Sequence, residues 1–359
     1  MTRNRFMIWT TDKLFELMID RHASDLVFVP GAAPALWISG AMRQLDSQTL
    51  TNDDIGQLFL PLLNDGQKRQ LTATGDVDFS VGKNGHGRLR INLHRQQGCW
   101  GAAIRLVPAE PPEFDDLKLP ARLLNLGDLN RGLVLVTGTA GSGKSTTLAA
   151  LIQYMNSRHA YHIITLEDPT EFTFTNQTAV IEQREIGVDS SSFASALRHV
   201  VRQRPDVILV GEMRDLETIA AALTAAEMGH LVIATLHTID AVQTVGRIID
   251  VFPAAQQAQV RVQLAATLQG VVCQTLFADE KNGGMIPAVE LMLSTPAVRR
   301  AIRENETHLL GGMIETGKSF GMQTMDAAIA ELVRAGHISS ETALARAHNP
   351  ERLSRLLAA

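Results

Sequence analysis

The stretch Gly138-Thr139-Ala140-Gly141-Ser142-Gly143-Lys144-Ser145 lies near the middle of this 359-residue chain. It fits the pattern GxxxxGK[ST], which is typical of a loop that binds the phosphates of a nucleoside triphosphate. An apolar run at 133–136 comes before it, and a helix-like run at 146–152 follows it. Strand, loop and helix in this order are the context that the pattern requires, so the sequence predicts a phosphate-binding α/β domain.

Each part of this loop has a physical role in holding phosphate. The glycines let main-chain N–H groups approach phosphate oxygens, and the N-terminus of the following helix adds positive potential. Lys144 brings a full charge to the β- and γ-phosphates, and the Ser145 hydroxyl can ligate Mg²⁺. We therefore expect ATP and Mg²⁺ as ligands. The expected ATP contacts in this loop are Gly138, Thr139, Ala140, Gly141, Ser142, Gly143, Lys144, Ser145 and Thr146.

Length and composition narrow the class of protein. A chain of 359 residues with 45% hydrophobic content exceeds one ordinary core and suggests two domains. The net charge of −5 argues against nucleic acid as the main partner. Two cysteines, Cys99 and Cys273, cannot make a zinc site or a disulfide framework, and they fit a reducing compartment. No apolar stretch approaches the length of a membrane span, so we expect a cytoplasmic protein.

Residues 1–107 are predicted to form a small α+β domain. In the stretch 88–94 apolar residues alternate with polar ones, as in a strand with one buried face. Residues 108–117 are rich in proline and acids and are predicted to be a linker. The expected elements of the first domain are a helix at 12–22, strands at 26–29, 36–39, 76–81 and 88–94, and a second helix that begins after 51–54.

Residues 118–359 are predicted to form a larger domain in which strands and helices alternate. Near-continuous apolar strands in such an alternation indicate a mostly parallel sheet with helices on both faces. The chain is expected to be mainly helical from Pro296 onward. The expected strands are 133–137, 162–167, 207–210, 231–236 and 286–293, and the expected helices are 144–156, 193–202, 216–228 and 243–249.

An acid follows the apolar strand candidate at 207–210. An ATPase with a phosphate loop needs a carboxylate beside Mg²⁺ and the attacking water. The usual aspartate position holds Gly211, so Glu212 must supply that carboxylate, acting through water. Ser145 and Glu212 are therefore the expected metal contacts.

Three further acids lie at the end of the strand candidate at 162–167: Glu167 is its last residue, and Asp168 and Glu171 follow it. The carboxyl ends of parallel strands face the ligand crevice of such a sheet. Glu167 could polarise a water molecule, and Asp168 could hold a metal-bound water. The alternative is an acidic turn that is fixed by Pro169.

Histidines and arginines complete the candidate site. His230 and His237 flank the strand candidate at 231–236 and could sense a γ-phosphate by hydrogen bonding, although structural roles are the alternative. Phosphoryl transfer gains from a cation placed on the developing charge, often by a neighbouring subunit. The candidate arginines are Arg90 and Arg105 in the first domain and Arg198, Arg202, Arg204 and Arg214 in the second.

Several blocks, taken in order, resemble the ATPase superfamily of type IV pili and type II secretion, and above all its pilus-retraction branch. The similarity is weaker in the first domain, where SDLVFVPGAAPALWISG (24–40) and DVDFSV (76–81) carry it. In the second domain the blocks are VTGTAGSGKSTTLAALI (136–152), ITLEDPTEF (164–172), QREIGVD (183–189), ALRHVVRQRPDVILVGEMRDLETI (196–219), ALTAAEMGHLVIATLHT (222–238), RIIDVFP (247–253) and SFGMQTMD (319–326).

The resemblance implies an N-terminal PAS-like domain joined to a RecA-like ATPase domain, with six copies in a ring and ATP between the two domains. Glu167 would act as general base and Glu212 as the Walker B glutamate. His230 and His237 would form the histidine box of the family. Arg90 and Arg105 would contact the nucleotide or the neighbouring subunit.

The implied function is a hexameric motor that hydrolyses ATP to power pilus retraction and twitching motility. Its expected place is the cytoplasmic face of the inner membrane. Its expected partners are further copies of itself, an inner-membrane platform protein and a paralogous motor ATPase, with neither nucleic acid nor zinc. The two cysteines separate the chain from pilus-assembly ATPases, which usually carry a four-cysteine zinc insert.

Other functions remain open at the level of sequence. The chain could be a secretion or DNA-transfer ATPase of the VirB11 or DotB type, or an accessory subunit that binds ATP and hydrolyses it poorly. The segment AVRRAIRE (297–304) resembles the retraction motif AIRNLIRE, but Arg300 and Ala301 replace asparagine and leucine. The block QREIGVD is closer to the accessory branch. A DNA-processing ATPase is a further alternative, against which the net acidity counts.

Overall fold

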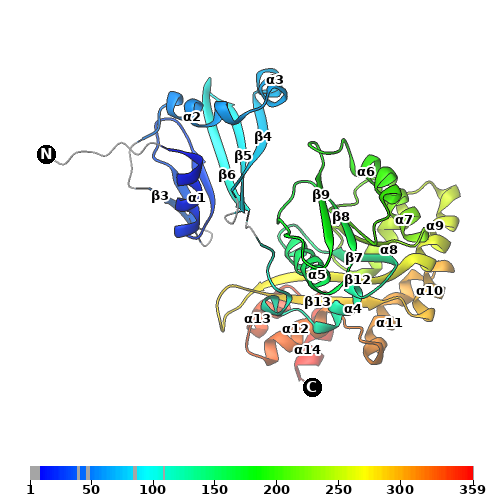
Figure 1. The fold of residues 1–359 in the computed structure, drawn as a ribbon. Helices are drawn as coiled ribbons and strands as arrows, with labels where there is room; N and C mark the ends of the chain where they lie inside the picture. The colour runs from blue at the N-terminus through cyan, green and yellow to red at the C-terminus, as the bar shows by residue number, and fades with distance from the viewer. Residues whose placement is uncertain (1–8, 39–40, 46–48, 84–86, 108–109, 359) are drawn as a thin grey trace. The chain divides into compact units, whose positions relative to one another are not determined.

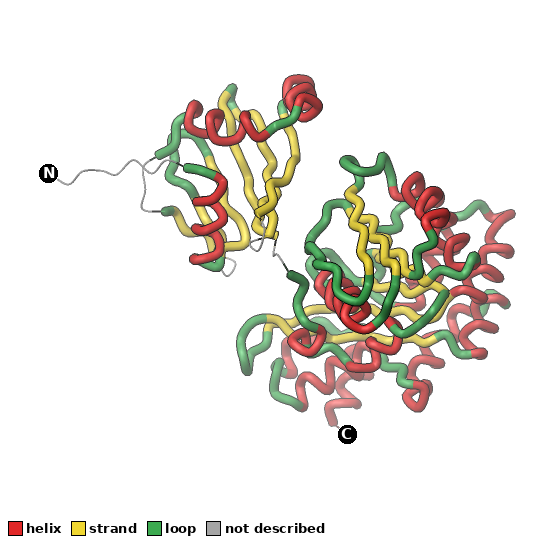
Figure 2. Tube along the Cα trace, viewed as in Figure 1, coloured by secondary structure: helices red, strands yellow, loops and turns green. Residues whose placement is uncertain are grey.

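The computed structural model describes residues 9–38, 41–45, 49–83, 87–107 and 110–358 (Figures 1 and 2). The chain divides into two compact units, Met1–Glu110 and Pro111–Ala359. Pro108 and Ala109 of the predicted linker lie outside the described residues.

The first unit contains an antiparallel sheet with the strand order β3-β2-β1-β6-β5-β4. Helices α1, α2 and α3 supply Phe15, Phe59 and Leu71 to the apolar side of this sheet. The opposite side carries polar residues, among them Arg90 and Arg105. The elements are α1 (Thr11–Asp20), β1 (Ala23–Phe28), β2 (Ala35–Ile38), β3 (Ala41–Gln44), α2 (Asn52–Phe59), α3 (Asp65–Thr74), β4 (Asp76–Lys83), β5 (Gly87–Gln96) and β6 (Cys99–Val107).

The predicted helices and strands of the first unit are confirmed, with small shifts at their ends. Ser39, the last residue of the predicted strand at 36–39, lies outside the described residues. The sequence predictions omit β3, β6 and α3. Helix α3 is polar apart from the buried Leu71, so its apolar pattern is weak. Its start is fixed instead by a capping box, in which Asn64 and Gln67 exchange side-chain and main-chain hydrogen bonds.

The second unit is built on a sheet with the strand order β13-β12-β7-β11-β10-β8-β9. Neighbouring strands are parallel except for the antiparallel pair of β12 and β13. The carboxyl ends of the parallel strands therefore share one edge. The strands are β7 (Gly132–Thr137), β8 (His162–Glu167), β9 (Val180–Glu185), β10 (Val207–Val210), β11 (Leu231–Leu236), β12 (Leu268–Ala278) and β13 (Met285–Leu293).

Both faces of this sheet are buried, as the apolar strands predict. In β7, Val134 and Val136 pack with α5 on one face, whereas Leu133 and Leu135 pack with the helices on the other. This arrangement confirms the predicted α/β fold class. The helices are α4 (Leu124–Gly127), α5 (Lys144–Arg158), α6 (Phe193–Val200), α7 (Leu216–Glu227), α8 (Ala241–Asp250), α9 (Ala254–Thr267), α10 (Pro296–Arg303), α11 (Leu310–Thr316), α12 (Met325–Arg334), α13 (Ser340–Ala345) and α14 (Pro350–Ala358).

The five predicted strands of the second unit are confirmed, and so is the helical character of the chain beyond Pro296. The sequence predictions omit α4, β9, α9 and β12. Strand β9 is polar and lies at the sheet edge. Helix α9 ends at Thr267 and β12 begins at Leu268, so no turn residues separate the two elements. Among the described residues, no helix combines the length and apolarity needed to cross a membrane.

A buried carboxylate joins three distant segments of the second unit. The Asp279 side chain is fully buried and accepts hydrogen bonds from Lys118 Nζ at 2.9 Å and His337 Nδ1 at 3.0 Å. The side chain of Asn282 adds a bond from the turn between β12 and β13. Hydrogen bonds from His337 and Lys118 hold the pKa of Asp279 well below its usual range, against the effect of burial.

Asp279→Asn is expected to destabilise the protein, because an amide cannot accept from all of these donors. A carboxyl whose pKa is depressed by folding contributes stability above the unfolded-state pKa of about 4, and that contribution is lost as the pH falls further. The gap in melting temperature between wild type and variant should therefore be full at pH 7 and shrink below about pH 4. Asp115→Asn, at an exposed site, is the control. A gap that does not change with pH would contradict this account.

Candidate active site

The phosphate-loop sequence forms a tight loop between β7 and α5. Gly138 has φ +145°, and a Cβ there would lie 2.4 Å from the Gln274 carbonyl oxygen and 2.5 Å from Ser142 Oγ. Only glycine fits this position. Gly143 also has a positive φ, +85°, immediately before α5 begins at Lys144.

Lys144 is held inside its own loop. Its Nζ donates to the carbonyl oxygens of Gly138 at 2.8 Å and Thr139 at 2.9 Å. Burial lowers the pKa of Lys144, against the attraction of Glu212 and Glu171. The buried Ser142 hydroxyl has no hydrogen-bond partner in the described part of the chain. A buried cation and a spare hydroxyl beside a glycine-rich main chain fit an anionic ligand such as a phosphate group.

The carboxyl ends of the strands complete a pocket of about 270 Å³ next to this loop. Glu167 ends β8, Glu212 follows β10 and His237 follows β11, so neighbouring strands bring three predicted site residues together. From the loop, Ala140, Gly141, Lys144 and Ser145 line the same pocket, and so do Asp168 and Glu171. Thr146 lies in the first turn of α5 and does not line the pocket.

Glu212 is paired with two cationic or protonatable side chains. Its Oε1 accepts from Arg214 Nε and lies 2.8 Å from His237 Nε2. Burial raises the pKa of Glu212, but Arg214 and His237 outweigh it and hold the pKa below its usual value. Glu212 is therefore a stable anion at neutral pH, suited to face a metal ion and its water.

Glu167 lies in a different environment. Its Oε1 accepts from Thr165 Oγ1 at 2.6 Å and from Gln183 Nε2 at 3.1 Å. Burial raises the pKa of Glu167, although these two bonds oppose the shift. A carboxylate with a raised pKa is the better proton acceptor of the pair, since its affinity for a proton is higher.

Glu171 and Gln183 are absent from the site residues predicted from sequence. Glu171 Oε1 accepts from Ser145 Oγ at 2.7 Å and so occupies the hydroxyl that is expected to ligate Mg²⁺. The position of Glu171 among the acids at the end of β8 could have identified it as a site residue. Gln183 comes from β9, which the sequence predictions omit, so no local signal links it to Glu167.

The structure does not bring His230 to this pocket. His230 precedes β11, and its Nδ1 contacts the carbonyl oxygen of Pro205 at 2.7 Å, at the amino ends of the strands. A strand of this length spans about 20 Å. The idea that both histidines contact one γ-phosphate within a single chain is therefore wrong, because the two ends of a strand lie at opposite edges of the sheet.

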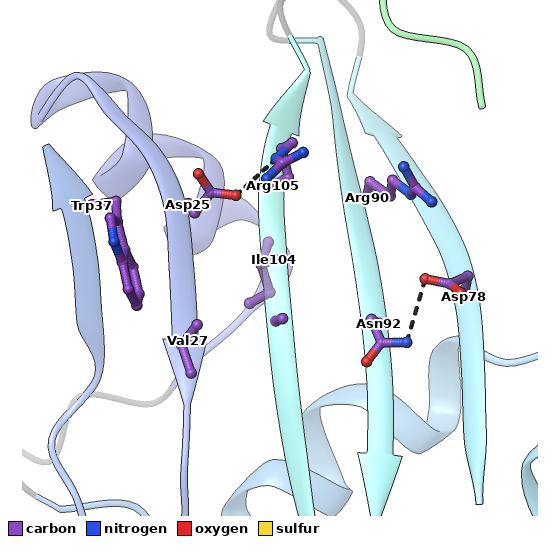
Figure 3. Close-up of a pocket in the computed structure, with 9 residues that line it drawn as sticks. Asp25, Val27, Trp37, Asp78, Arg90, Asn92, Ile104 and Arg105 are labelled. Carbon is purple, nitrogen blue, oxygen red and sulfur yellow. Dashed lines mark hydrogen bonds and ion pairs between the residues drawn. The ribbon is translucent and has the colours of Figure 1, made fainter. Parts of the chain in front are cut away.

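Arg90 and Arg105 lie opposite each other on neighbouring strands β5 and β6 of the first unit. They line a groove of about 530 Å³ on the polar side of that sheet, together with Trp37 (Figure 3). Arg105 Nε donates to Asp25 Oδ1 at 2.8 Å, and the Arg105 side chain is 65% exposed. The first unit thus presents two arginines on one open surface, as a contact to a phosphate or a neighbouring subunit requires.

The pocket of the second unit combines the parts that phosphoryl transfer to water needs. The glycine-rich main chain and Lys144 can hold an anion, Glu212 provides a fixed negative charge, and Glu167 can accept a proton. Among the residues that the structure describes, no group of three or more His, Cys, Asp or Glu side chains is arranged to hold a metal ion.

Comparisons with known proteins agree with this geometry. Residues 115–314 match the family model described as "Type II/IV secretion system protein". PilT of Pseudomonas aeruginosa, a type IV pilus retraction ATPase, is 43% identical over 92% of this chain and 95% of its own length. PilU of the same organism, a type IV pilus ATPase, is 36% identical over 96% of this chain and 91% of its own.

A solved structure extends the similarity to three dimensions. The crystal structure of the pilus retraction motor PilT with bound ADP superposes with a TM-score of 0.90 at 42% identity. The match covers 97% of this chain and 99% of that one, so it includes both units. On the fold, the pocket and these similarities, the chain belongs to the type II/IV secretion system protein family, on the branch that includes PilT.

Proposed function

We propose that this chain is an ATPase that powers the retraction of a type IV pilus. The observation that carries the enzymatic part is the convergence of Lys144, Glu167, Glu212 and His237 on one pocket beside the phosphate loop. Retraction rests on the similarity to PilT, which extends over almost the whole of both chains. Bound Mg-ATP supplies the phosphorus atom that water attacks.

The residues of the pocket divide this chemistry between them. Main-chain N–H groups of the loop and Lys144 hold phosphate oxygens, and Lys144 exchanges its carbonyl partners for them. Glu167 takes the proton of the attacking water. Glu212 stays ionised and would orient a water molecule beside Mg²⁺ when the metal is bound. His237, at 2.8 Å from Glu212, would sense whether a γ-phosphate is present.

Mg²⁺ is proposed to bind at Ser145. Its hydroxyl is the usual protein ligand at this motif position. The hydrogen bond from Ser145 to Glu171 must then break or turn, since both use the same hydroxyl.

The working assembly is proposed to be a homohexamer at the inner-membrane face of the pilus machine. Arg90 and Arg105 would reach the nucleotide of a neighbouring copy, because a cation placed in trans stabilises the charge that develops on phosphate. ATP binding would close the first domain of one copy on the second domain of its neighbour. Hydrolysis would then reopen this contact, so that one subunit moves against the next and pulls on a platform protein in the membrane.

Deleting the gene in its native host is the test of retraction. We expect more surface pili than in wild type and no twitching, because pili would be assembled but not withdrawn. A complementing copy that carries Glu212→Gln should not restore twitching. Fewer pili than in wild type would contradict the proposal and favour a role in assembly or secretion.

An accessory motor subunit is the second candidate. Arg300 and Ala301 depart from the retraction motif, and the block QREIGVD is closer to the accessory branch. Such a subunit would hydrolyse ATP slowly by itself and faster beside a partner motor. Turnover of the purified protein, alone and mixed with a retraction ATPase from the same host, distinguishes the two functions.

A further inference from the structure

We propose that Gln183 is a positioning residue that holds Glu167 ready to accept the proton of the attacking water. This role rests on the proposed ATPase function. Gln183 lies on β9, directly across from Thr165 on β8, so both strands contribute a side chain to the Glu167 carboxylate. The proposed function assigns no task to Gln183.

The Gln183 side-chain amide makes three hydrogen bonds within this site, and they use both of its N–H donors. Its Nε2 donates to Glu167 Oε1 at 3.1 Å and to the Phe172 carbonyl oxygen at 2.8 Å. Its Oε1 accepts from the Phe174 N–H at 3.0 Å. Two of these partners only accept and one only donates, so a single orientation of the amide satisfies them all.

The Gln183 amide also links the two ends of the acidic turn that follows β8. The turn begins at Glu167 and reaches Phe172 and Phe174, and Gln183 bonds to both ends. Between these ends lies Glu171, whose carboxylate holds Ser145 at 2.7 Å. Gln183 therefore fixes the proton acceptor and the segment next to the proposed metal position as one unit.

The surroundings of Glu167 make the hydrogen bond from Gln183 important. Burial disfavours the charged form of the carboxyl group, and the nearby charge of Glu171 acts in the same direction. Lys144, Glu212 and His237 line the same pocket from the other elements. A donor that bonds to the carboxylate favours its ionised form, which is the form that can take up a proton. Gln183, Thr165 and the Glu171 N–H all act in this direction.

Two substitutions remove this donor in different ways. Gln183→Met keeps the length of the side chain and deletes the amide. Gln183→Glu keeps the shape but places a second carboxyl group about 3 Å from Glu167, where like charges raise the pKa of the pair further. The matched control is Glu182→Met on the same strand, because adjacent strand residues point to opposite faces of a sheet. Glu182 is exposed and paired with His162.

The measurement is the single-turnover rate of ATP hydrolysis by the full chain between pH 5 and 9, together with calorimetric binding of Mg-ATP. We expect the acidic limb of the rate profile to move up by about one pH unit in Gln183→Met, the shift that one hydrogen bond to a charged group produces. Gln183→Glu should move it further. Mg-ATP affinity should stay within about twofold in both variants, and Glu182→Met should match wild type.

The possible results distinguish an error in the role of Gln183 from an error in the proposed ATPase function. A lower rate with an unmoved acidic limb, or an unchanged profile, would overturn the role of Gln183, since loss of packing alone does not shift a pKa in this way. If Gln183→Met does not fold, the isosteric Gln183→Glu decides by the same criterion. Wild-type protein that hydrolyses no ATP at any pH would overturn the proposed function and this role with it.

Discussion

Glu212→Gln is expected to lower the rate of ATP hydrolysis by about 10²- to 10³-fold while Mg-ATP binding stays close to wild type. The amide has the shape of the carboxylate but no charge with which to orient a metal-bound water. It also replaces one acceptor oxygen with an NH₂ group, so Arg214 and His237 lose the negative charge that they share. The loss therefore falls on the hydrolysis step and leaves the loop that holds the phosphates intact.

The control for this variant is Glu217→Gln in α7. Glu217 is 70% exposed and 3.8 Å from Arg198, so its neutralisation removes one negative charge without touching the pocket. Steady-state turnover and Mg-ATP binding, measured side by side, separate hydrolysis from affinity. Glu212→Gln with wild-type turnover would show that another group orients the water.

The core of the pocket could be predicted because each of its parts is local in sequence. The loop residues are contiguous, and the glycine pattern specifies a main-chain conformation that a side chain at Gly138 would block. Glu167 ends one short apolar strand, and Glu212 lies just beyond another. Parallel strands end at the same edge, so the strand pattern alone places both acids beside the loop.

The remaining parts of the pocket depend on which strands are neighbours. Gln183 reaches Glu167 only because β9 pairs with β8, and the polar sequence of β9 does not signal a strand. The histidines show the reverse problem. His230 and His237 look equivalent in sequence because both flank β11, but only the carboxyl end of that strand faces the pocket. The predicted parallel sheet already distinguishes them, because only the residue that follows a strand lies at its carboxyl end.

Lys144→Ala is expected to weaken Mg-ATP binding by about 10- to 100-fold and to abolish measurable turnover at ordinary ATP concentrations. Hydrogen bonds from a charged donor contribute about 1.5–3 kcal/mol each, and every 1.4 kcal/mol is a tenfold change in affinity. The buried position of Lys144 strengthens this contribution, because little water competes for the ammonium group. Isothermal titration calorimetry with Mg-ATP measures the loss directly.

Two further variants show whether the position or the charge matters. Lys68→Ala removes a lysine that is exposed on α3 and should bind Mg-ATP like wild type. Lys144→Arg keeps the charge, but a planar guanidinium cannot replace a compact ammonium that bonds to both Gly138 and Thr139 within a tight loop. It should therefore remain as inactive as Lys144→Ala. Wild-type affinity in Lys144→Ala would mean that the loop amides alone hold the phosphates, and full activity in Lys144→Arg would mean that charge suffices without the geometry seen here.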